Sequence, residues 1–230
     1  MSCVLVDVDG TLLGGPSSEL RFVMHLLLRG RIGVKQAMEA VAFPLRWFSR
    51  YGRHVFKKNK SYLAGLPVGD IAAEAELFVK QSVTPRLRGE ILDLIAGHVT
   101  RGDRVVLLTG TPEFIAEPLA RLLGAHGVCA TRCACQDGIY TADPPLLHPF
   151  GEDKVILARE ICREHGSPMS EAIAYADSIH DLALMLQVGR PVAAWPDGVL
   201  ADIARKGNWL ILPQHGTLRR TVTNHETTQG

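Results

Sequence analysis

The sequence predicts an α/β protein with a doubly wound, mostly parallel sheet and an inserted helical cap subdomain. Short, continuous apolar runs recur at 3–6, 104–109, 172–177 and 209–212, which is typical of strands buried on both faces of a parallel sheet. Helical patterns at 113–123 and 153–166 alternate with these runs, as they do in doubly wound sheets. Between the first two runs the periodicity is helical only, which indicates an insertion.

These patterns divide the chain into a core at 1–13 and 100–213, a helical cap at 14–99 and a flexible tail at 214–230. Cap helices are expected near 18–29, 34–50 and 70–82, and the breaks fall at Gly30, Gly52 and the Gly65–Pro67 turn. In the core helix at 113–123, Thr111 is expected to cap and Pro112 to take the first helical position. The tail is polar and has no periodicity.

The composition is that of an ordinary globular protein, with 230 residues of which 47% are hydrophobic and 21% charged. The formal net charge of +1 gives no support to nucleic-acid binding. Five scattered cysteines make a poor disulfide framework and favour a reducing, cytoplasmic location. We expect no transmembrane segment, because no apolar run approaches the roughly 20 residues that span a bilayer, and no signal peptide, because the chain begins with a strand.

Four aspartates follow the ends of predicted strands. Asp7 and Asp9 come directly after the first apolar run, and Gly10 permits a sharp turn there. Asp177 ends the run at 172–177, and Asp181 follows at the start of a predicted helix, 181–189. In open α/β sheets ligands bind beyond the carboxyl ends of the strands. Carboxylates gathered there would repel one another without a cation, so the pattern predicts a Mg²⁺ site.

Groups that suit a phosphate occur at the same predicted edge of the sheet. Thr109 supplies a hydroxyl at the end of the second strand, and Gly110 lets backbone N–H groups approach an anion. Lys154, near the start of the next helix, adds a positive charge.

The segments DVDGT (7–11), LLTGT (107–111), Lys154 and ADSIHD (176–181) resemble the four motifs of the haloacid dehalogenase superfamily. Their order, with a helical segment inserted after the first motif, is most similar to its phosphoserine phosphatase-like branch. The resemblance covers residues 1–13 and about 100–212. It implies a core of the Rossmann-like type and a phosphoric monoester hydrolase that uses Mg²⁺.

The resemblance also implies a role for each matching residue. Asp7 would attack phosphorus and form an aspartyl-phosphate, and Asp9 would protonate the leaving oxygen and later activate water. Thr109 would bind the phosphoryl oxygens, and Lys154 would balance the negative charge. Mg²⁺ would be held by Asp7, Asp177 and the backbone carbonyl of Asp9, with Asp181 acting on metal-bound water or orienting Lys154.

Two departures from the family pattern bear on activity and substrate. His180 stands where the family usually has Asn, and we expect it to retune the site without abolishing activity, since His can still donate a hydrogen bond. The family's phosphoserine phosphatases bind the substrate amine through a glutamate after the first motif. Here the nearest candidate, Glu19, falls later than expected, so phosphoserine is not the favoured substrate.

The segment at 46–60 is rich in basic and aromatic residues and has no acidic residue. Its ordinary interpretation is an amphipathic cap helix with aromatics in the core and charges in solvent. The alternative is a lip that attracts polyanionic or lipid phosphate substrates, with Arg53 and Lys57 among the substrate-binding residues. Nucleic-acid binding is the least favoured interpretation.

Several functional alternatives stay open. A phosphotransferase would use the same residues and pass the phosphoryl group to an acceptor alcohol. A binding module would keep the phosphate pocket without turnover, although an acid beside a nucleophile argues against it. Cys129, Cys133 and Cys135 lack metal-site spacing, and His25 is expected to be a structural cap histidine. The leaving alcohol and the oligomeric state are not predicted.

Overall fold

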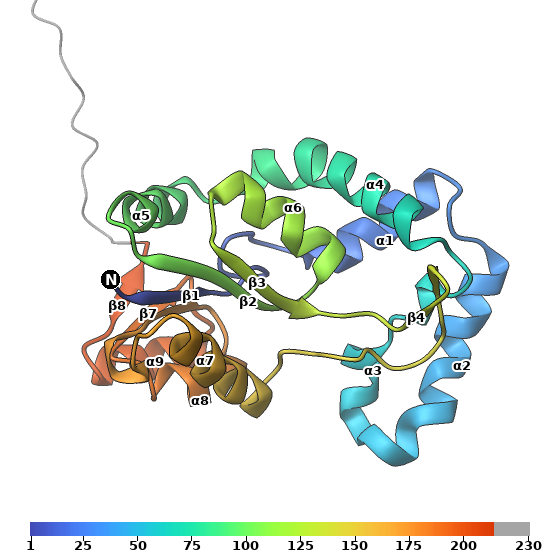
Figure 1. Ribbon diagram of the computed structural model, residues 1–230. Helices are drawn as coiled ribbons and strands as arrows, with labels where there is room; N and C mark the ends of the chain where they lie inside the picture. Colours follow the sequence, from blue (N-terminus) through green and yellow to red (C-terminus); the bar gives the residue numbers. More distant parts are fainter. Residues whose placement is uncertain (214–230) are drawn as a thin grey trace, which may run out of the picture.

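A six-stranded sheet, parallel throughout, forms the centre of the protein in the computed structural model, which describes residues 1–213 (Figure 1). The strand order is β3-β2-β1-β6-β7-β8, so the winding direction reverses between β1 and β6. Ligands of doubly wound sheets bind at such a reversal. The predicted fold class is confirmed. The strands are β1 Cys3–Val6, β2 Arg104–Pro112, β3 Gly127–Thr131, β6 Ile173–Ala176, β7 Arg190–Ala194 and β8 Leu210–Leu212.

Helices cover both faces of the sheet because the side chains of each strand alternate between them. Val4 and Val6 of β1 face one core cluster, while Cys3 and Leu5 face the other. Residues of α1, α4, α5 and α6 complete the first cluster, and residues of α7 and α8 complete the second. The helices on the sheet are α5 Gly89–Thr100, α6 Glu113–Leu123, α7 Glu152–Glu164, α8 Leu182–Met185 and α9 Gly198–Lys206. Helix α5 packs with the core although it falls within the segment 14–99 that the sequence assigned to the cap.

The inserted helices lie at the right-hand end and along the upper right of the molecule in Figure 1. They are α1 Ser18–Leu28, α2 Val34–Tyr51, α3 Val55–Lys58 and α4 Val68–Phe78, and a π-helical turn at Val79–Val83 continues α4. A hairpin of the core, β4 Cys135–Gln136 and β5 Ile139–Tyr140, reaches over to them. The Gly65 N–H donates to the Tyr140 carbonyl at 2.8 Å, and the Tyr140 N–H donates to the Leu66 carbonyl at 2.9 Å. These bonds fix the cap against the core.

Some elements differ from the sequence-based expectation. β3 and β7 were not predicted, because the first begins with glycine and the second, RPVAA, contains proline and small residues in place of a long apolar run. The helix expected from Asp181 is only the short α8. The expectation that Thr111 caps α6 is wrong, since Thr111 and Pro112 belong to β2. The tail predicted at 214–230 lies outside the described residues.

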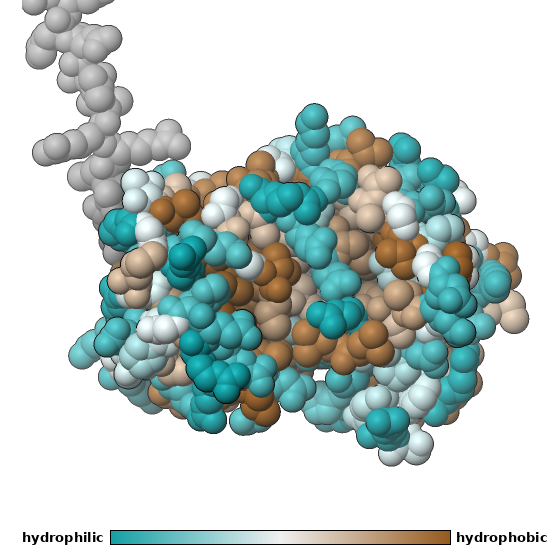
Figure 2. All heavy atoms as spheres, viewed as in Figure 1, coloured by the Kyte–Doolittle hydropathy of each residue, from teal (hydrophilic) through white to brown (hydrophobic). Residues whose placement is uncertain are grey.

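Helix α2 exposes more apolar surface than the amphipathic interpretation predicted. Phe43 is fully buried and Trp47 and Tyr51 are half-buried, as expected of core aromatics. Leu45 is 83% exposed and Phe48 is 54% exposed, so the opposite face of the helix is also apolar. Figure 2 shows apolar side chains mixed with polar ones over the cap. Among residues 1–213, no helix combines the length and the apolar character needed to cross a membrane.

Phe22 joins the cap to the core, and its truncation tests how strongly the two are coupled. Its ring is fully buried and lies 5.2 Å from the rings of both Phe78 and Phe114. We expect Phe22→Ala to lower the free energy of unfolding by about 3–5 kcal/mol, because the cavity cannot be refilled. Urea unfolding measures this. The exposed-site control Leu45→Ala should change stability by no more than about 0.5 kcal/mol, and a similar loss in both variants would contradict the assignment.

Candidate active site

A cavity of about 360 Å³ lies at the carboxyl ends of β1, β2 and β6, beneath the cap. Both parts of the chain contribute to its walls. The core supplies the three strand ends and the start of α7, and the cap supplies α1 and the segment after α2. The lining includes Asp7, Asp9, Ser17, Glu19, Lys57, Lys60, Thr109, Gly110, Thr111, His148, Phe150, Lys154, Asp177, Ser178, His180 and Asp181.

Lys154 holds two of the predicted carboxylates together. Its ammonium group is buried and lies 3.1 Å from Asp7 Oδ1 and 2.8 Å from Asp181 Oδ1. Burial alone would lower the pKa of this lysine, but the charges of Asp7 and Asp181 outweigh burial and raise its pKa, so the side chain stays charged. The first turn of α7 thereby places a fixed positive charge beside the end of β1.

Asp177 completes a group of three carboxylates. One oxygen each of Asp7, Asp177 and Asp181 lies within 4.8 Å of the others. The close approach depends on Gly10, where the backbone has φ +86° and an added Cβ would lie 1.9 Å from the Asp177 carboxylate. Arg88 fixes this turn by donating to the carbonyl oxygens of Gly10 and Thr11. Only glycine fits a turn with this geometry.

The three carboxylates carry more negative charge than Lys154 neutralises. Burial, together with the charges of Asp181 and Asp9, raises the pKa of Asp7 to about 6 despite the nearby lysine. Burial, Asp7 and Asp181 raise the pKa of Asp177 to about 7. Crowded carboxylate oxygens with raised pKa values are a donor set that suits a hard divalent cation such as Mg²⁺. Among residues 1–213, no other set of three or more His, Cys, Asp or Glu side chains comes this close together.

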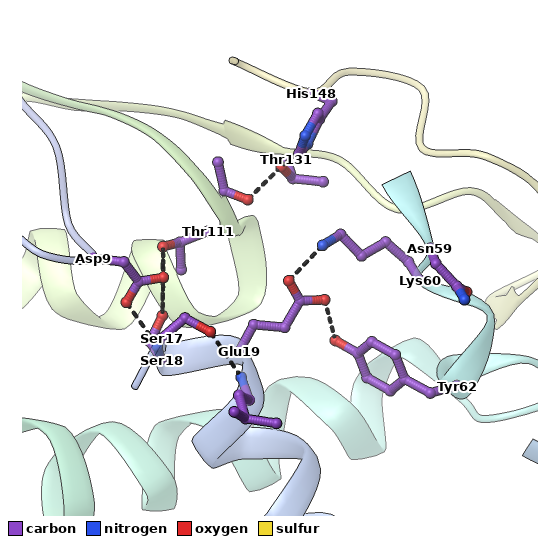
Figure 3. Close-up of polar contacts among 12 residues, drawn as sticks. Asp9, Ser17, Ser18, Glu19, Asn59, Lys60, Tyr62, Thr111, Thr131 and His148 are labelled. Atoms are coloured by element: carbon purple, nitrogen blue, oxygen red, sulfur yellow. Dashed lines mark hydrogen bonds and ion pairs between the residues drawn. The ribbon is translucent and has the colours of Figure 1, made fainter. Parts of the chain in front are cut away.

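Asp9 lies in a separate environment (Figure 3). Its Oδ1 accepts a hydrogen bond from the Ser18 N–H at 2.6 Å, and its Oδ2 accepts from the hydroxyls of Ser18 and Thr111, both at 3.0 Å. The Thr109 hydroxyl donates in turn to Thr111 Oγ1 at 3.2 Å. Burial raises the pKa of Asp9, although these hydrogen bonds oppose the shift. The site therefore contains carboxylates in two different settings.

The cap wall of the cavity carries a buried ion pair. Lys60 is 5% exposed and pairs with Glu19, which also accepts a hydrogen bond from the Tyr62 hydroxyl at 3.0 Å. Figure 3 shows the Glu19 carboxylate between these two partners. The later position of Glu19 in the sequence does not keep it out of the cavity, because α1 begins at Ser18 and points its first turn inward.

Most predicted site residues meet in this cavity. The structure brings together Asp7, Asp9, Thr109, Gly110, Lys154, Asp177, Asp181 and Lys57. The Asp9 side chain is not part of the three-carboxylate group. Arg53 is exposed and does not line the cavity. Sequence reasoning gave no site role to Ser18, Thr111 or His148. The two adjacent serines at the start of α1 and the second threonine of LLTGT were the available signals for the first two.

The sequence also singled out His180, His25 and three cysteines. His180 is exposed, and its ring lies 5.0 Å from that of Phe150 at the rim of the cavity. His25 pairs with Glu74 at 3.1 Å, which confirms the expected structural role. All five cysteines are free thiols, and Cys129, Cys133 and Cys135 form no metal-binding group.

Comparison with known proteins places the chain in a family. Residues 4–186 match the model of the haloacid dehalogenase-like hydrolase family. A probable phosphatase of Mycobacterium tuberculosis is 29% identical over 220 residues, which cover 90% of this chain and 73% of that protein. The chain belongs to the haloacid dehalogenase-like hydrolase family and is an enzyme of the phosphatase type, which confirms the predicted class.

Solved structures share the fold. The crystal structure of a Bordetella pertussis protein of unknown function is 29% identical, has a TM-score of 0.75, and aligns over 91% of this chain and 97% of that one. A phosphoserine phosphatase captured as an analogue of its phospho-aspartyl intermediate has a TM-score of 0.55 and 17% identity, over 91% of each chain. At that identity the likeness concerns the fold alone.

The raised pKa values of Asp7 and Asp177 predict how Mg²⁺ and pH act together on stability. A carboxyl whose pKa is raised in the folded state stabilises it at low pH, and this contribution is lost as pH rises through about 6 and about 7. Mg²⁺ requires the ionised forms. We therefore expect Mg²⁺ to raise Tm more at about pH 8 than at about pH 5.5.

Thermal unfolding with Mg²⁺ and with chelator measures this difference. In the matched variant Asp177→Asn the metal-dependent increase should largely disappear, while the chelated protein should gain stability at the higher pH because one repelling charge is gone. An equal Mg²⁺ effect at both pH values would contradict the assignment of these aspartates as ligands.

Proposed function

We propose that the protein is a Mg²⁺-dependent phosphatase that hydrolyses a small or medium organic phosphate monoester through an aspartyl-phosphate at Asp7. The observation that supports this most directly is the division of the carboxylates into two settings. Asp7 lies against the Lys154 ammonium group, and Asp9 lies apart among hydroxyl and N–H donors. Pairs of carboxylates in different environments take different roles in proton and group transfer.

Asp7 is suited to act as the nucleophile. Its carboxylate lies at the end of β1 and faces the cavity, where Lys154 holds its Oδ1 at 3.1 Å. In the first step an Asp7 oxygen would form a bond to phosphorus while the bond between phosphorus and the leaving oxygen breaks. Thr109 and the backbone of Gly110, which line the same cavity, would bind the phosphoryl oxygens.

Asp9 is suited to act as the general acid and then the general base. Its raised pKa favours the protonated form that would give its proton to the leaving alcohol. In the second step the ionised Asp9 would take a proton from water as that water attacks phosphorus, which releases inorganic phosphate and restores the Asp7 carboxylate. Ser18 and Thr111 hold the side chain in one orientation through both steps.

Asp7, Asp177 and Asp181 would hold the Mg²⁺ ion. When bound, the ion supplies positive charge that lets an anionic carboxylate approach an anionic phosphate. Lys154 supplies a second positive charge from the protein itself, and its contacts with Asp7 and Asp181 keep both side chains in place. Thr11 donates a hydrogen bond to Asp177 at 3.3 Å and orients the third carboxylate.

The cavity limits the size of the substrate. A volume of about 360 Å³ accommodates a phosphate and a leaving alcohol of modest size. Lys57 and Lys60 add positive charge on the cap side, which favours anionic substrates. The cytoplasmic location inferred from the cysteines and the binding of a lipid phosphate both remain proposals.

Phosphate release from a panel of sugar, amino-alcohol, nucleotide and lipid phosphates tests the proposed activity. We expect release that requires Mg²⁺, stops with chelator, and falls by a factor of about 10³ or more in Asp7→Asn, because the nucleophile is lost. Lys206→Asn, at an exposed position of α9, is the matched surface control and should keep full activity. Residual activity of more than a few per cent in a folded Asp7→Asn variant would exclude Asp7 as the nucleophile.

A further inference from the structure

The outward side of cap helix α2 carries a continuous row of exposed apolar side chains. Successive members are three or four residues apart, so at about 100° per residue they lie on one side of the helix, opposite the fully buried Phe43. Their exposed fractions range from 54% to 83%. This row is called the apolar stripe, and it consists of Val34, Met38, Val41, Leu45 and Phe48.

Basic side chains run along one edge of the apolar stripe. Lys35 directly follows Val34, Arg46 directly follows Leu45, and Arg50 lies one turn after Arg46, so all three lie on the same edge. Glu39 shares this edge and pairs with Arg46. It is the only acidic residue between positions 34 and 60 of the sequence.

Most of the positive charge on this part of the cap is not neutralised. Arg46 pairs with Glu39, and Lys60 pairs with Glu19. The other basic residues of the segment form no ion pair within residues 1–213, and all of them except the half-buried Lys58 are exposed. They are Lys35, Arg50, Arg53, Lys57 and Lys58. The face that presents the apolar stripe is therefore both apolar and cationic.

This combination is typical of a helix that lies in the plane of a membrane interface. The apolar side of such a helix enters the boundary between headgroups and acyl chains, and its lysines and arginines meet the headgroups. Continuous exposed apolar surface generally marks an interaction site. Helix α2 lies along the outer edge of the molecule at the right of Figure 1, where a surface can approach it along its length.

The charge of this face decides between the possible occupants. Contact with the same face of a second copy would gather two sets of unpaired cations and supply no free carboxylate to match them. The last residues of the chain, 214–230, contain two arginines and one glutamate, so they offer no net negative charge. A membrane that contains anionic lipids supplies both an apolar interior and a negative surface potential.

We propose that the apolar stripe and its basic edge dock the cap on the surface of an anionic membrane. Helix α2 would lie on the membrane and not cross it. The docked face adjoins the active site, because Arg50 lines a cavity of about 470 Å³ together with Lys57 and Phe150, which also line the catalytic cavity. Docking therefore brings the catalytic cavity close to the membrane surface. This inference does not depend on the proposed function.

Flotation of the protein with lipid vesicles tests the docking. Vesicles of phosphatidylcholine with about 30% phosphatidylglycerol are compared with vesicles of phosphatidylcholine alone. We expect the wild-type protein to bind the anionic vesicles about tenfold more tightly than the neutral ones, and less tightly as salt is added, because salt screens the charges. No binding to the anionic vesicles, or equal binding to both kinds, would overturn the proposal.

The contribution of the apolar stripe is measured with Val41→Gln combined with Leu45→Gln. Glutamine keeps the helix propensity but removes apolar surface that would leave water on docking, so binding to the anionic vesicles should fall about tenfold. The matched control is Leu122→Gln combined with Ile156→Gln, since both residues are exposed and lie on the sheet helices α6 and α7. The control should bind as the wild type does.

A second variant of the apolar stripe keeps the test decisive if the first does not fold. Met38→Gln combined with Phe48→Gln changes two other positions of the same row and should show the same loss of binding. Thermal unfolding establishes that each variant is folded. Wild-type binding by either folded variant would overturn the proposal.

Lys35→Gln combined with Arg50→Gln tests the basic edge. Binding to the anionic vesicles should fall about tenfold, while binding to the neutral vesicles should change little. The matched control, Arg163→Gln combined with Lys206→Gln, removes the same net charge from exposed positions on α7 and α9. Equal losses in the two variants would mean that net charge alone attracts the protein, which would overturn the role of this face.

Sedimentation of the protein without lipid tests the competing occupant, a second copy of the chain. We expect the wild type and the Val41→Gln, Leu45→Gln variant to have the same molecular mass in solution. A wild-type dimer that becomes a monomer in this variant would assign the apolar stripe to self-association and overturn the proposal.

Discussion

Electrostatic crowding around the buried Lys154 ammonium group is the constraint on which the site depends. Two segments distant in sequence, the end of β1 and the stretch after β6, bring Asp7, Asp177 and Asp181 within reach of one another, and a single lysine cannot neutralise them. The fold tolerates this arrangement because parallel strands end at one edge and Gly10 leaves room for Asp177. The excess negative charge is what makes the site suited to a divalent cation and, with it, to an anionic substrate.

The core and the cap contribute different groups to the cavity. The core supplies groups suited to phosphoryl transfer, held by hydrogen bonds and ion pairs with little freedom. The cap supplies Glu19 and Lys60, which line the same cavity, and Tyr62, which donates a hydrogen bond to Glu19. The hairpin bonded to the cap at Gly65 and Leu66 leads on along the chain to His148, so both parts of the wall are anchored together. Substrate choice can therefore change with few effects on the chemistry.

The sequence predicted those parts of the protein that depend on local pattern. Asp7 and Asp177 were recognisable because each ends an apolar run, and the order of four motifs indicated the family. β3 and β7 escaped prediction because their residues are small or interrupted by proline. The pairing of Glu19 with Lys60, and of Thr111 with Asp9, joins residues far apart in the chain, which no periodicity reveals. The charge of Arg53 likewise did not indicate whether its side chain would line the cavity.

The central claim is that Asp7 carries the phosphoryl group during turnover. Rapid acid quenching of the enzyme during hydrolysis of para-nitrophenyl phosphate with Mg²⁺, followed by peptide mass spectrometry, tests it most directly. The account predicts one added phosphoryl group on Asp7, present during turnover and absent once substrate is exhausted. Steady turnover with no phosphorylated peptide at any quench time, or a phosphoryl group on another residue, would contradict it.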